Sequence, residues 1–325
     1  MDLRAIVAGV SLLLFTCNGT RGEGLSYNFY EASCPHVEDI VRAALRPLFL
    51  TDPTTPAALL RLMFHDCQVQ GCDASILVDS SEGYASSEMG SVKNFGVRKR
   101  EIVGILKSML EAECPQQVSC ADILILAARE AVALSGGPKI QVPLGRKDSI
   151  VAPSSKIADS LLPPANVGVG DTLQLFAKFG MTIEESVALL GAHTLGVTHC
   201  STVLNRLNEA DNGQVKGAIS PGFEAFLRLK CPQGSLTSNL SFVLNDITTF
   251  AFDNHYYNNA MGGRGVLLVD AEMVMDPRTA PAIQEFAANQ DYFFEAFSSA
   301  FVKLSRSGVL IGNQGVVRKT CNAIE

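Results

Sequence analysis

The sequence has no tryptophan, no excess of basic residues and no long apolar segment. Its 325 residues include 26 Lys and Arg against 33 Asp and Glu, which gives a net charge of −7. Because phosphate binding requires a basic surface, this balance excludes a nucleic-acid partner. No stretch reaches the roughly 20 apolar residues that a membrane-spanning helix needs. With hydrophobic residues at 47%, the chain can instead bury a large core.

The N-terminus, MDLRAIVAGVSLLLFTCNGTRGEG, has the pattern of a secretory signal peptide. Arg4 precedes an apolar run from Ala5 to Phe15, and small and polar residues follow. A buried N-terminal helix is the alternative. We expect a signal peptide over residues 1–23, cleaved at about residues 20–24, and one mature domain over residues 24–325 without a membrane anchor. On the secretory route Asn239, in the motif NLS, is the expected glycosylation site.

The cysteines lack C-x-x-C pairs, which argues against a zinc site. Of the nine cysteines, Cys17 falls inside the signal peptide and eight remain. An even number in a secreted chain predicts disulfides, but the sequence leaves about 105 pairings open.

Strand-like alternation is scarce, and helical patterns dominate. Residues 120–138 are apolar nearly all round and end at Gly-Gly-Pro, which predicts a buried central helix. Residues 182–193 open with a capping box, and residues 282–308 suggest two further helical segments. Only KIQVPLGRKDS, residues 139–149, is a candidate strand. The predicted fold class is mostly α, in one compact domain.

Residues 61–75, RLMFHDCQVQGCDAS, place charged groups directly after an apolar run. If TPAALLRLMFHDC is a helix, Arg61, Phe64 and His65 lie at i, i+3 and i+4 and share one face. A buried guanidinium, ring and imidazole suit acid–base chemistry on a small polar molecule. The alternative is an ordinary core histidine with a satisfied hydrogen bond.

The same stretch continues into a loop that is rich in oxygen ligands. Asp66 points away from Arg61, and Asp73 and Ser75 follow within a tight loop bounded by two cysteines. Carboxylates, a hydroxyl and loop carbonyls suit Ca²⁺, which takes six to eight oxygen ligands. Gly71 permits the sharp turn.

A second informative histidine is His193, in LLGAHTLG. Its neighbours Gly191, Ala192 and Gly196 are small, so a bulky planar group could approach it closely. The alternative is a histidine that is merely stabilised by the dipole at a helix end.

These motifs carry a family resemblance. The chain resembles the class III secreted plant haem peroxidases from residue 29 to residue 321, through FYEASCP, LLRLMFHDC, GCDAS, CPQQVSCADILILAAR, GGP, PLGRKDS, LLGAHTLG, FDNHYY and a final TC. The resemblance implies the haem-peroxidase fold, a single domain of two helical halves with one haem b between them and four disulfides. It also implies a monomer that is secreted to the cell wall or apoplast.

The implied activity is reduction of hydrogen peroxide via a ferryl intermediate, followed by one-electron oxidation of small phenolic donors. By motif position, His65 would be the acid and base, Arg61 would stabilise charge and Phe64 would contact the haem. Asn94, in EMGSVKN, would orient His65.

On the other side of the haem, His193 would be the axial iron ligand, backed by Asp270. Pro163, in LLPPAN, would line the haem edge where phenolic donors approach.

The resemblance also implies two Ca²⁺ ions and a disulfide pairing. The first ion would be held by Asp66, Val69, Gly71, Asp73, Ser75 and Glu88. The second would be held by Thr194, Asp246, Thr249 and Asp253, in a segment one residue shorter than the family pattern. The cysteines would pair as Cys34–Cys114, Cys67–Cys72, Cys120–Cys321 and Cys200–Cys231.

The chain departs from the family at several positions. Gln68 stands where Phe is usual, VRKREIVGI replaces the usual segment after Asn94, and Ile140 stands at the position of the one common tryptophan. The absence of tryptophan excludes oxidation through a surface tryptophanyl radical. Two alternatives stay open from the sequence: a haem- and calcium-binding extracellular protein with little or no turnover, and a calcium-stabilised hydrolase built on His65 and Asp66.

Overall fold

Helices form most of the part of the chain that the structure, a computed structural model, describes. That part is residues 24–324 without residues 81–86, 152, 212–216, 218 and 235–240, so the expected signal peptide and Asn239 lie outside it. The α-helices are α1 Val37–Thr51, α2 Thr55–Gln68, α3 Arg100–Glu113, α4 Cys120–Leu134, α5 Ser155–Leu161, α6 Val169–Ala177, α7 Ile183–Leu190, α8 Cys200–Asp211, α9 Pro221–Lys230, α10 His255–Met261, α11 Leu268–Glu272, α12 Ala280–Ala288 and α13 Gln290–Ser305. The predicted mostly α class is confirmed. Within the described residues, none of these helices has the length and apolar character to cross a membrane.

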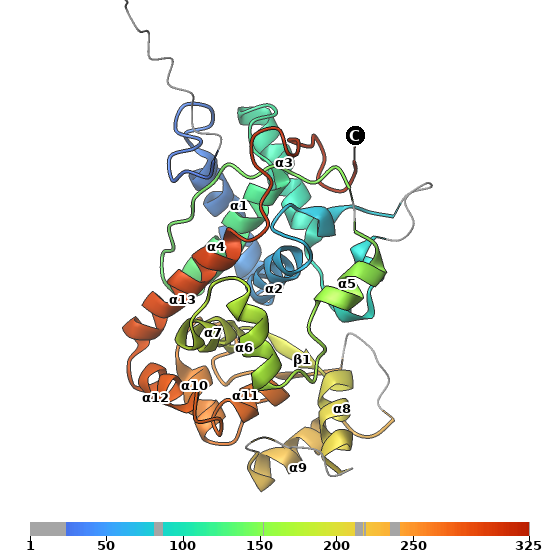
Figure 1. Ribbon diagram of the computed structural model, residues 1–325, viewed down its shortest axis with the longest axis vertical. Coiled ribbons are helices and arrows are strands. Elements are labelled where there is room, and N and C mark those ends of the chain that lie inside the picture. Colours follow the sequence, from blue (N-terminus) through green and yellow to red (C-terminus); the bar gives the residue numbers. More distant parts are fainter. Residues whose placement is uncertain are drawn as a thin grey trace, which may run out of the picture.

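Helix α4 is the centre of the first half of the molecule (Figure 1). All residues from Cys120 to Val132 are buried, as the nearly uniform apolar sequence predicts. The Ser119 hydroxyl caps the helix by accepting from the Asp122 N–H at 3.1 Å, and Gly136, at a φ of 97°, lets the chain leave it. Helices α1, α2 and α3 all pack on α4, so α2 is held rigidly on a buried support.

The second half is built around α7 and α13, which pack on each other. The predicted capping box of α7 is present: Thr182 and Glu185 each accept from the other's backbone N–H. Residues 282–308 form the predicted two helical segments, which are the end of α12 and the whole of α13. Buried phenylalanines fill the space beside α13, with Phe252 and Phe297 ring centroids 4.7 Å apart. Helix α13 also contacts α2, so it joins the two halves.

The one sheet in the described part of the chain is a short antiparallel pair of strands. Strand β1 (Val197–His199) pairs with β2 (Phe242–Leu244), and His199 lies opposite Phe242. A short 3₁₀ helix, Gly191–Thr194, leads from α7 into β1. This sheet therefore fixes the segment that follows His193.

The predicted strand over residues 139–149 is wrong. The segment is extended, but it makes only isolated bridges, from Leu144 to Ser26, from Lys147 to Leu310 and from Asp148 to Val316. Its buried side chains hold it in place through polar contacts, since Arg146 Nη1 lies 2.8 Å from Asp122. An alternating sequence is here an extended loop in a polar part of the core.

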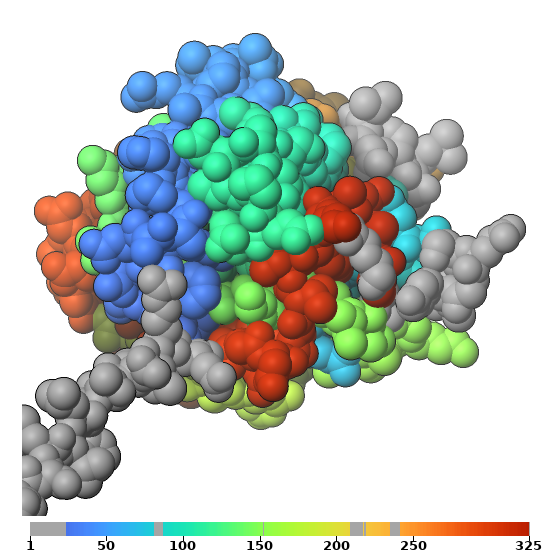
Figure 2. All heavy atoms as spheres, turned by 90° about the horizontal axis from the view of Figure 1, so that it is seen from above, coloured from blue at the N-terminus to red at the C-terminus, as the bar shows by residue number. Residues whose placement is uncertain are grey.

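Four disulfides connect the elements, and they pair the cysteines as the resemblance implies. Cys120–Cys321 joins the start of α4 to the C-terminal segment, and the Asp79 N–H donates to the Asn322 carbonyl at 2.9 Å. Figure 2 shows this C-terminal segment lying across the surface close to α3.

Candidate active site

Helix α2 presents Arg61, Phe64 and His65 on one face, as their spacing predicts. His65 is buried, and Arg61 Nε donates to His65 Nε2 at 3.0 Å. A second guanidinium nitrogen of Arg61 donates to the Phe95 carbonyl at 3.1 Å. The guanidinium is therefore fixed beside the imidazole.

The tautomer of His65 follows from its other neighbour. Asn94 Oδ1 lies 2.6 Å from His65 Nδ1, while Asn94 Nδ2 donates to the Glu88 carbonyl at 2.7 Å. That second bond fixes the amide, so its oxygen faces the ring and can only accept. Nδ1 therefore carries the proton, and Nε2 is left as a base.

Burial lowers the pKa of both His65 and Arg61, and this sets the charge of each at neutral pH. Burial, and then the positive charge of Arg61, lower the pKa of His65 to about 3. Burial, and then the charge of Arg98, lower the pKa of Arg61 to about 10. At neutral pH the site thus offers a neutral imidazole beside a guanidinium cation.

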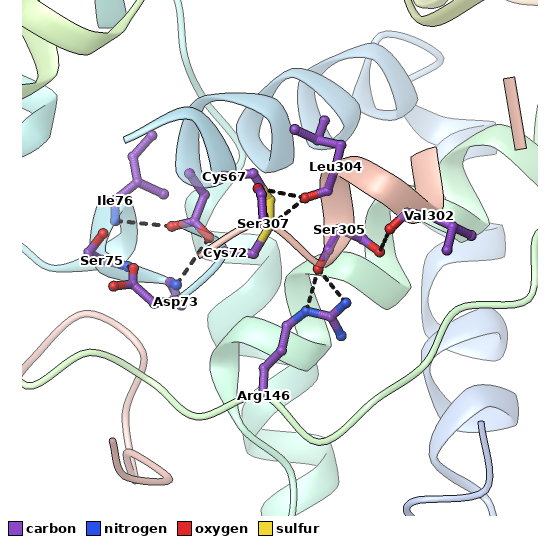
Figure 3. The surroundings of a disulfide bond; sticks show 12 residues. Cys67, Cys72, Asp73, Ser75, Ile76, Arg146, Val302, Leu304, Ser305 and Ser307 are labelled. Atoms are coloured by element: carbon purple, nitrogen blue, oxygen red, sulfur yellow. Dashed lines mark hydrogen bonds between the residues drawn. A yellow bond between two sulfur atoms is a disulfide. The ribbon is translucent and has the colours of Figure 1, made fainter. Parts of the chain in front are cut away.

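A cluster of buried oxygen ligands lies behind α2. Asp66 points away from Arg61, and it accepts from the Ala74 N–H at 3.0 Å. Figure 3 shows Asp73, Ser75 and Ile76 beside the disulfide that ends this helix, with the end of α13 on its other side. The turn at Gly71 has a φ of 141° and approaches Gly308 so closely that a Cβ would lie 2.1 Å from its carbonyl oxygen.

This cluster has the electrostatics of a cation site. Both carboxylate oxygens of Glu88 and the hydroxyl of Ser75 are buried without a hydrogen-bond partner among the described residues. Burial, and then repulsion from Asp73, raise the pKa of Glu88 to about 8. Burial also raises the pKa of Asp66, with the charges of Asp73 and Glu88 adding to it. A Ca²⁺ ion would satisfy these oxygens and offset the repulsion. The expected backbone ligands, at Val69 and Gly71, lie on the same loop.

His193 lies in the short 3₁₀ helix after α7, with its ring held from behind. Asp270 Oδ1 is 2.9 Å from His193 Nδ1, and it also accepts from the Tyr256 hydroxyl at 2.6 Å. The other Asp270 oxygen accepts from the Leu267 N–H at 3.3 Å. The His193 side chain is 32% exposed and that of Asp270 only 4%. A buried carboxylate therefore fixes Nδ1 and leaves Nε2 for a metal.

The second expected calcium cluster differs from the predicted ligand set in one residue. Thr194 Oγ1 lies 3.1 Å from Asp246 and 3.4 Å from Asp253. The hydroxyl of Thr248 lies 2.9 Å and 3.1 Å from the same two carboxylates. The Thr249 hydroxyl donates instead to two backbone carbonyls, at 2.9 and 3.1 Å. The structure thus places the side chain of Thr248, not that of Thr249, between the two aspartates.

The sequence did not indicate a role for His199. This histidine, in β1, packs on Phe95 with ring centroids 5.2 Å apart. A Cβ added at Gly96 would lie 2.6 Å from the His199 ring and 3.3 Å from Arg61, so the three residues meet. Burial, and then the charges of Arg61 and Arg98, lower the pKa of His199. Tyr256 was likewise missed, although it lies in the quoted motif FDNHYY.

Pro163 lies two residues after the end of α5. The two carbonyls before it, of Leu161 and Leu162, accept from Gln68 at 3.1 Å and from Lys93 at 2.6 Å. The segment that ends in Pro163 is therefore tied to α2 and to the residue before Asn94.

Comparisons with known proteins match most of the chain. The family model described as "Peroxidase" matches residues 41–289. The chain is 57% identical over 309 residues to "Peroxidase 29" of Arabidopsis thaliana, covering 94% of this chain and 91% of that protein. It is 39% identical over 302 residues to "Peroxidase 28", covering 92% of each chain, and 37% identical over 303 residues to "Peroxidase 21", covering 92% and 91%, both also of Arabidopsis thaliana.

Proposed function

Because the chain belongs to the plant secretory peroxidases, haem enzymes that reduce hydrogen peroxide, we propose that His65 and Arg61 act on peroxide while His193 holds the haem iron. One observation carries this proposal: both histidines are fixed through Nδ1 by an acceptor. For His65 the acceptor is Asn94 Oδ1 at 2.6 Å, and for His193 it is Asp270 Oδ1 at 2.9 Å. In His65, Nε2 is therefore the atom that would exchange a proton, and in His193 it is the atom that would bind iron.

The donor set on the His193 side fits a haem. When bound, the haem supplies the iron on which the peroxide O–O bond is cleaved and which retains two oxidising equivalents. His193 Nε2 would bind the haem iron, and Phe64 would contact the haem. Asp270 makes the imidazole of His193 more basic, which favours O–O cleavage.

The residues on the α2 face would move one proton and stabilise charge. His65 Nε2 would take a proton from one oxygen of hydrogen peroxide and return it to the departing oxygen, which leaves as water. Arg61 would stabilise the negative charge that develops on the departing oxygen. Phenolic donors would approach at Pro163. Two donor molecules each lose one electron and one proton per peroxide, which completes the second water.

We further propose two calcium ions. The first would bind Asp66, Asp73, Ser75 and Glu88 with the carbonyls of Val69 and Gly71, and the unpartnered buried oxygens of Ser75 and Glu88 support it. The second would bind at Thr194, Asp246 and Asp253, with Thr248 contributing the hydroxyl and Thr249 remaining the expected further ligand.

The mature enzyme would be a secreted monomer of residues 24–325 in the cell wall or apoplast, with a glycan on Asn239. Its four disulfides support an oxidising compartment.

The absorption spectrum of the secreted protein, before and after one equivalent of hydrogen peroxide, tests the proposal. We expect a Soret band that loses intensity with peroxide and recovers on adding a phenol. His65→Ala should slow the loss of intensity at least ~10²-fold, since acid–base groups contribute that much or more. A Soret band of the wild type that does not change on addition of peroxide would favour the alternative of a haem-binding protein with little turnover. A near-normal rate in His65→Ala would contradict the role of His65.

A further inference from the structure

Gln68 continues the catalytic face of α2 by one more turn. Arg61, Phe64, His65 and Gln68 stand at i, i+3, i+4 and i+7, which places all four on one stripe of the helix. Gln68 is only 7% exposed. The family resemblance leads one to expect a phenylalanine at this position, so a polar amide here is a property of this chain.

The amide nitrogen of Gln68 holds the segment that leads to Pro163. It donates to the Leu161 carbonyl at 3.1 Å. Lys93 Nζ donates to the Leu162 carbonyl at 2.6 Å and to the Asp159 carbonyl at 2.5 Å. The last carbonyls of a helix have no partner within it, so these two side chains supply the missing donors at the end of α5. The proposed donor entrance is thus anchored to the catalytic helix.

The amide oxygen of Gln68, unlike the nitrogen, has no hydrogen-bond partner among the residues that the structure describes, and it is buried. A buried acceptor without a partner lowers stability, so native proteins rarely keep one that no ligand or water satisfies. The bond from the nitrogen to Leu161 fixes the direction of the amide, so the oxygen points away from that carbonyl and can accept from an O–H or N–H group of a ligand.

We propose that Gln68 determines donor specificity, with its oxygen accepting a hydrogen bond from the hydroxyl group of a phenolic donor. This inference rests on the proposed function, because it takes Pro163 as the place where donors enter. The nitrogen of Gln68 keeps the entrance in position, and the oxygen selects donors that carry an O–H. A phenylalanine at this position would offer contact area alone.

Four proteins with haem and calcium bound test the proposal: wild type, Gln68→Met, Lys93→Met and the surface control Gln117→Met. Steady-state kinetics are measured with guaiacol, which has a phenolic hydroxyl, and with ABTS, an aromatic donor without one. Stopped-flow measurements give the peroxide step separately. In Gln68→Met we expect the KM for guaiacol to rise about threefold to tenfold, the range for one lost hydrogen bond. The KM for ABTS should change no more than it does in Lys93→Met, because both variants loosen the entrance, and the peroxide step should stay within twofold of wild type.

The other variants separate the effect of the Gln68 oxygen from the effect of a loosened entrance. Lys93→Met loosens the Leu162 carbonyl but leaves the Gln68 oxygen, so it should change both donors alike, and Gln117→Met should change neither. An equal rise for both donors in Gln68→Met, or no rise, would overturn the proposal, since the oxygen would then hold an internal water. If Gln68→Met does not fold, Gln68→Phe replaces it with the same expectation. A wild type without a peroxide step would instead refute the proposed function before any donor is added.

Discussion

Two histidines with the same ring serve opposite ends of the proposed reaction because different groups accept from Nδ1. A neutral amide, Asn94, orients His65, and burial leaves that imidazole neutral, with its pKa at about 3. A carboxylate, Asp270, holds His193 and makes it a stronger electron donor. The chemistry of each ring is therefore set by its acceptor.

Two substitutions around Asp270 should move the reduction potential of the haem iron in opposite directions. Asp270→Asn removes the negative charge behind His193, so the potential should rise and the peroxide step should slow by about 10- to 100-fold. Tyr256→Phe removes the hydroxyl that donates to Asp270 at 2.6 Å. The carboxylate then pulls harder on the His193 proton, and the potential should fall.

Redox titration of the holoenzyme measures both shifts. Shifts of the same sign in the two variants would show that Tyr256 and Asp270 act only as packing, and the assigned role of the carboxylate would be wrong.

For single residues, the sequence predicts contacts between residues that lie close along the chain. It misses contacts between residues that are far apart in the sequence. The Arg61, Phe64 and His65 face follows from helical spacing alone. His199 and Arg61 both approach Gly96 although they are far apart along the chain, and no local pattern contains that meeting. The place of Thr248 between Asp246 and Asp253 depends on the backbone path of the segment, which the sequence alone does not give.

Among the helices, α7 is held to α13 by a buried carboxylate, that of Glu185. Glu185 accepts from the Thr182 N–H at 2.7 Å, from the Ser299 hydroxyl at 2.6 Å and from Lys303 Nζ at 2.7 Å. Burial alone would raise its pKa, but the bonds from Lys303, Ser299 and Thr182 outweigh it and lower the pKa to about 2. Glu185 thus fixes the start of α7 to α13.

Glu185→Gln should destabilise the holoenzyme by about 1 kcal/mol at pH 7, since it removes the charged half of a capping box. The native pKa lies below the ordinary glutamate value of 4.5, so this charge stabilises the fold fully above pH 4.5 and progressively less as pH falls toward 2. Thermal unfolding of wild type and variant at pH 7 and pH 3 should show a gap that narrows at pH 3. Glu113→Gln, at the exposed end of α3, is the matched control. A gap that stays constant with pH would rule out this contribution of the charge.

The sequence predicts elements best where one local pattern agrees with burial. Residues 120–138 and the capping box at Thr182 are such cases. The extended segment 139–149 misleads because its alternation reflects Arg146 and Asp148 inside a polar core, where they bond to other elements instead of to a strand. Strands β1 and β2 have three residues each, too few for any alternation to be visible.

For the whole molecule, the proposed first calcium cluster connects the buried loop after α2 to the proposed acid–base residue. The Glu88 backbone accepts from Asn94, which in turn accepts from His65. An ion that holds the Glu88 side chain would therefore also hold the His65 ring in place.

Removal of calcium with a chelator should lower the melting temperature by about 5–10 °C, the effect of losing a tightly bound ligand. It should also slow the peroxide step, because Asn94 loses its support. Added Ca²⁺ should restore both, and Mg²⁺ should not, since Mg²⁺ prefers a smaller octahedral site. Melting curves and stopped-flow traces of the same samples check this. Unchanged behaviour in a sample shown by elemental analysis to have lost its calcium would contradict the coupling.

Two of the disulfides divide the molecule in a way that the helices do not reveal. Cys34–Cys114 and Cys120–Cys321 span 80 and 201 residues of sequence, and these spans do not overlap. His65 lies within the first and His193 within the second, with only residues 115–119 between them. Each of the two histidines thus lies in a loop of backbone that a disulfide closes. A protease that cuts the backbone once inside either loop leaves the two ends joined by the disulfide, so the nicked protein still keeps both histidines on one molecule.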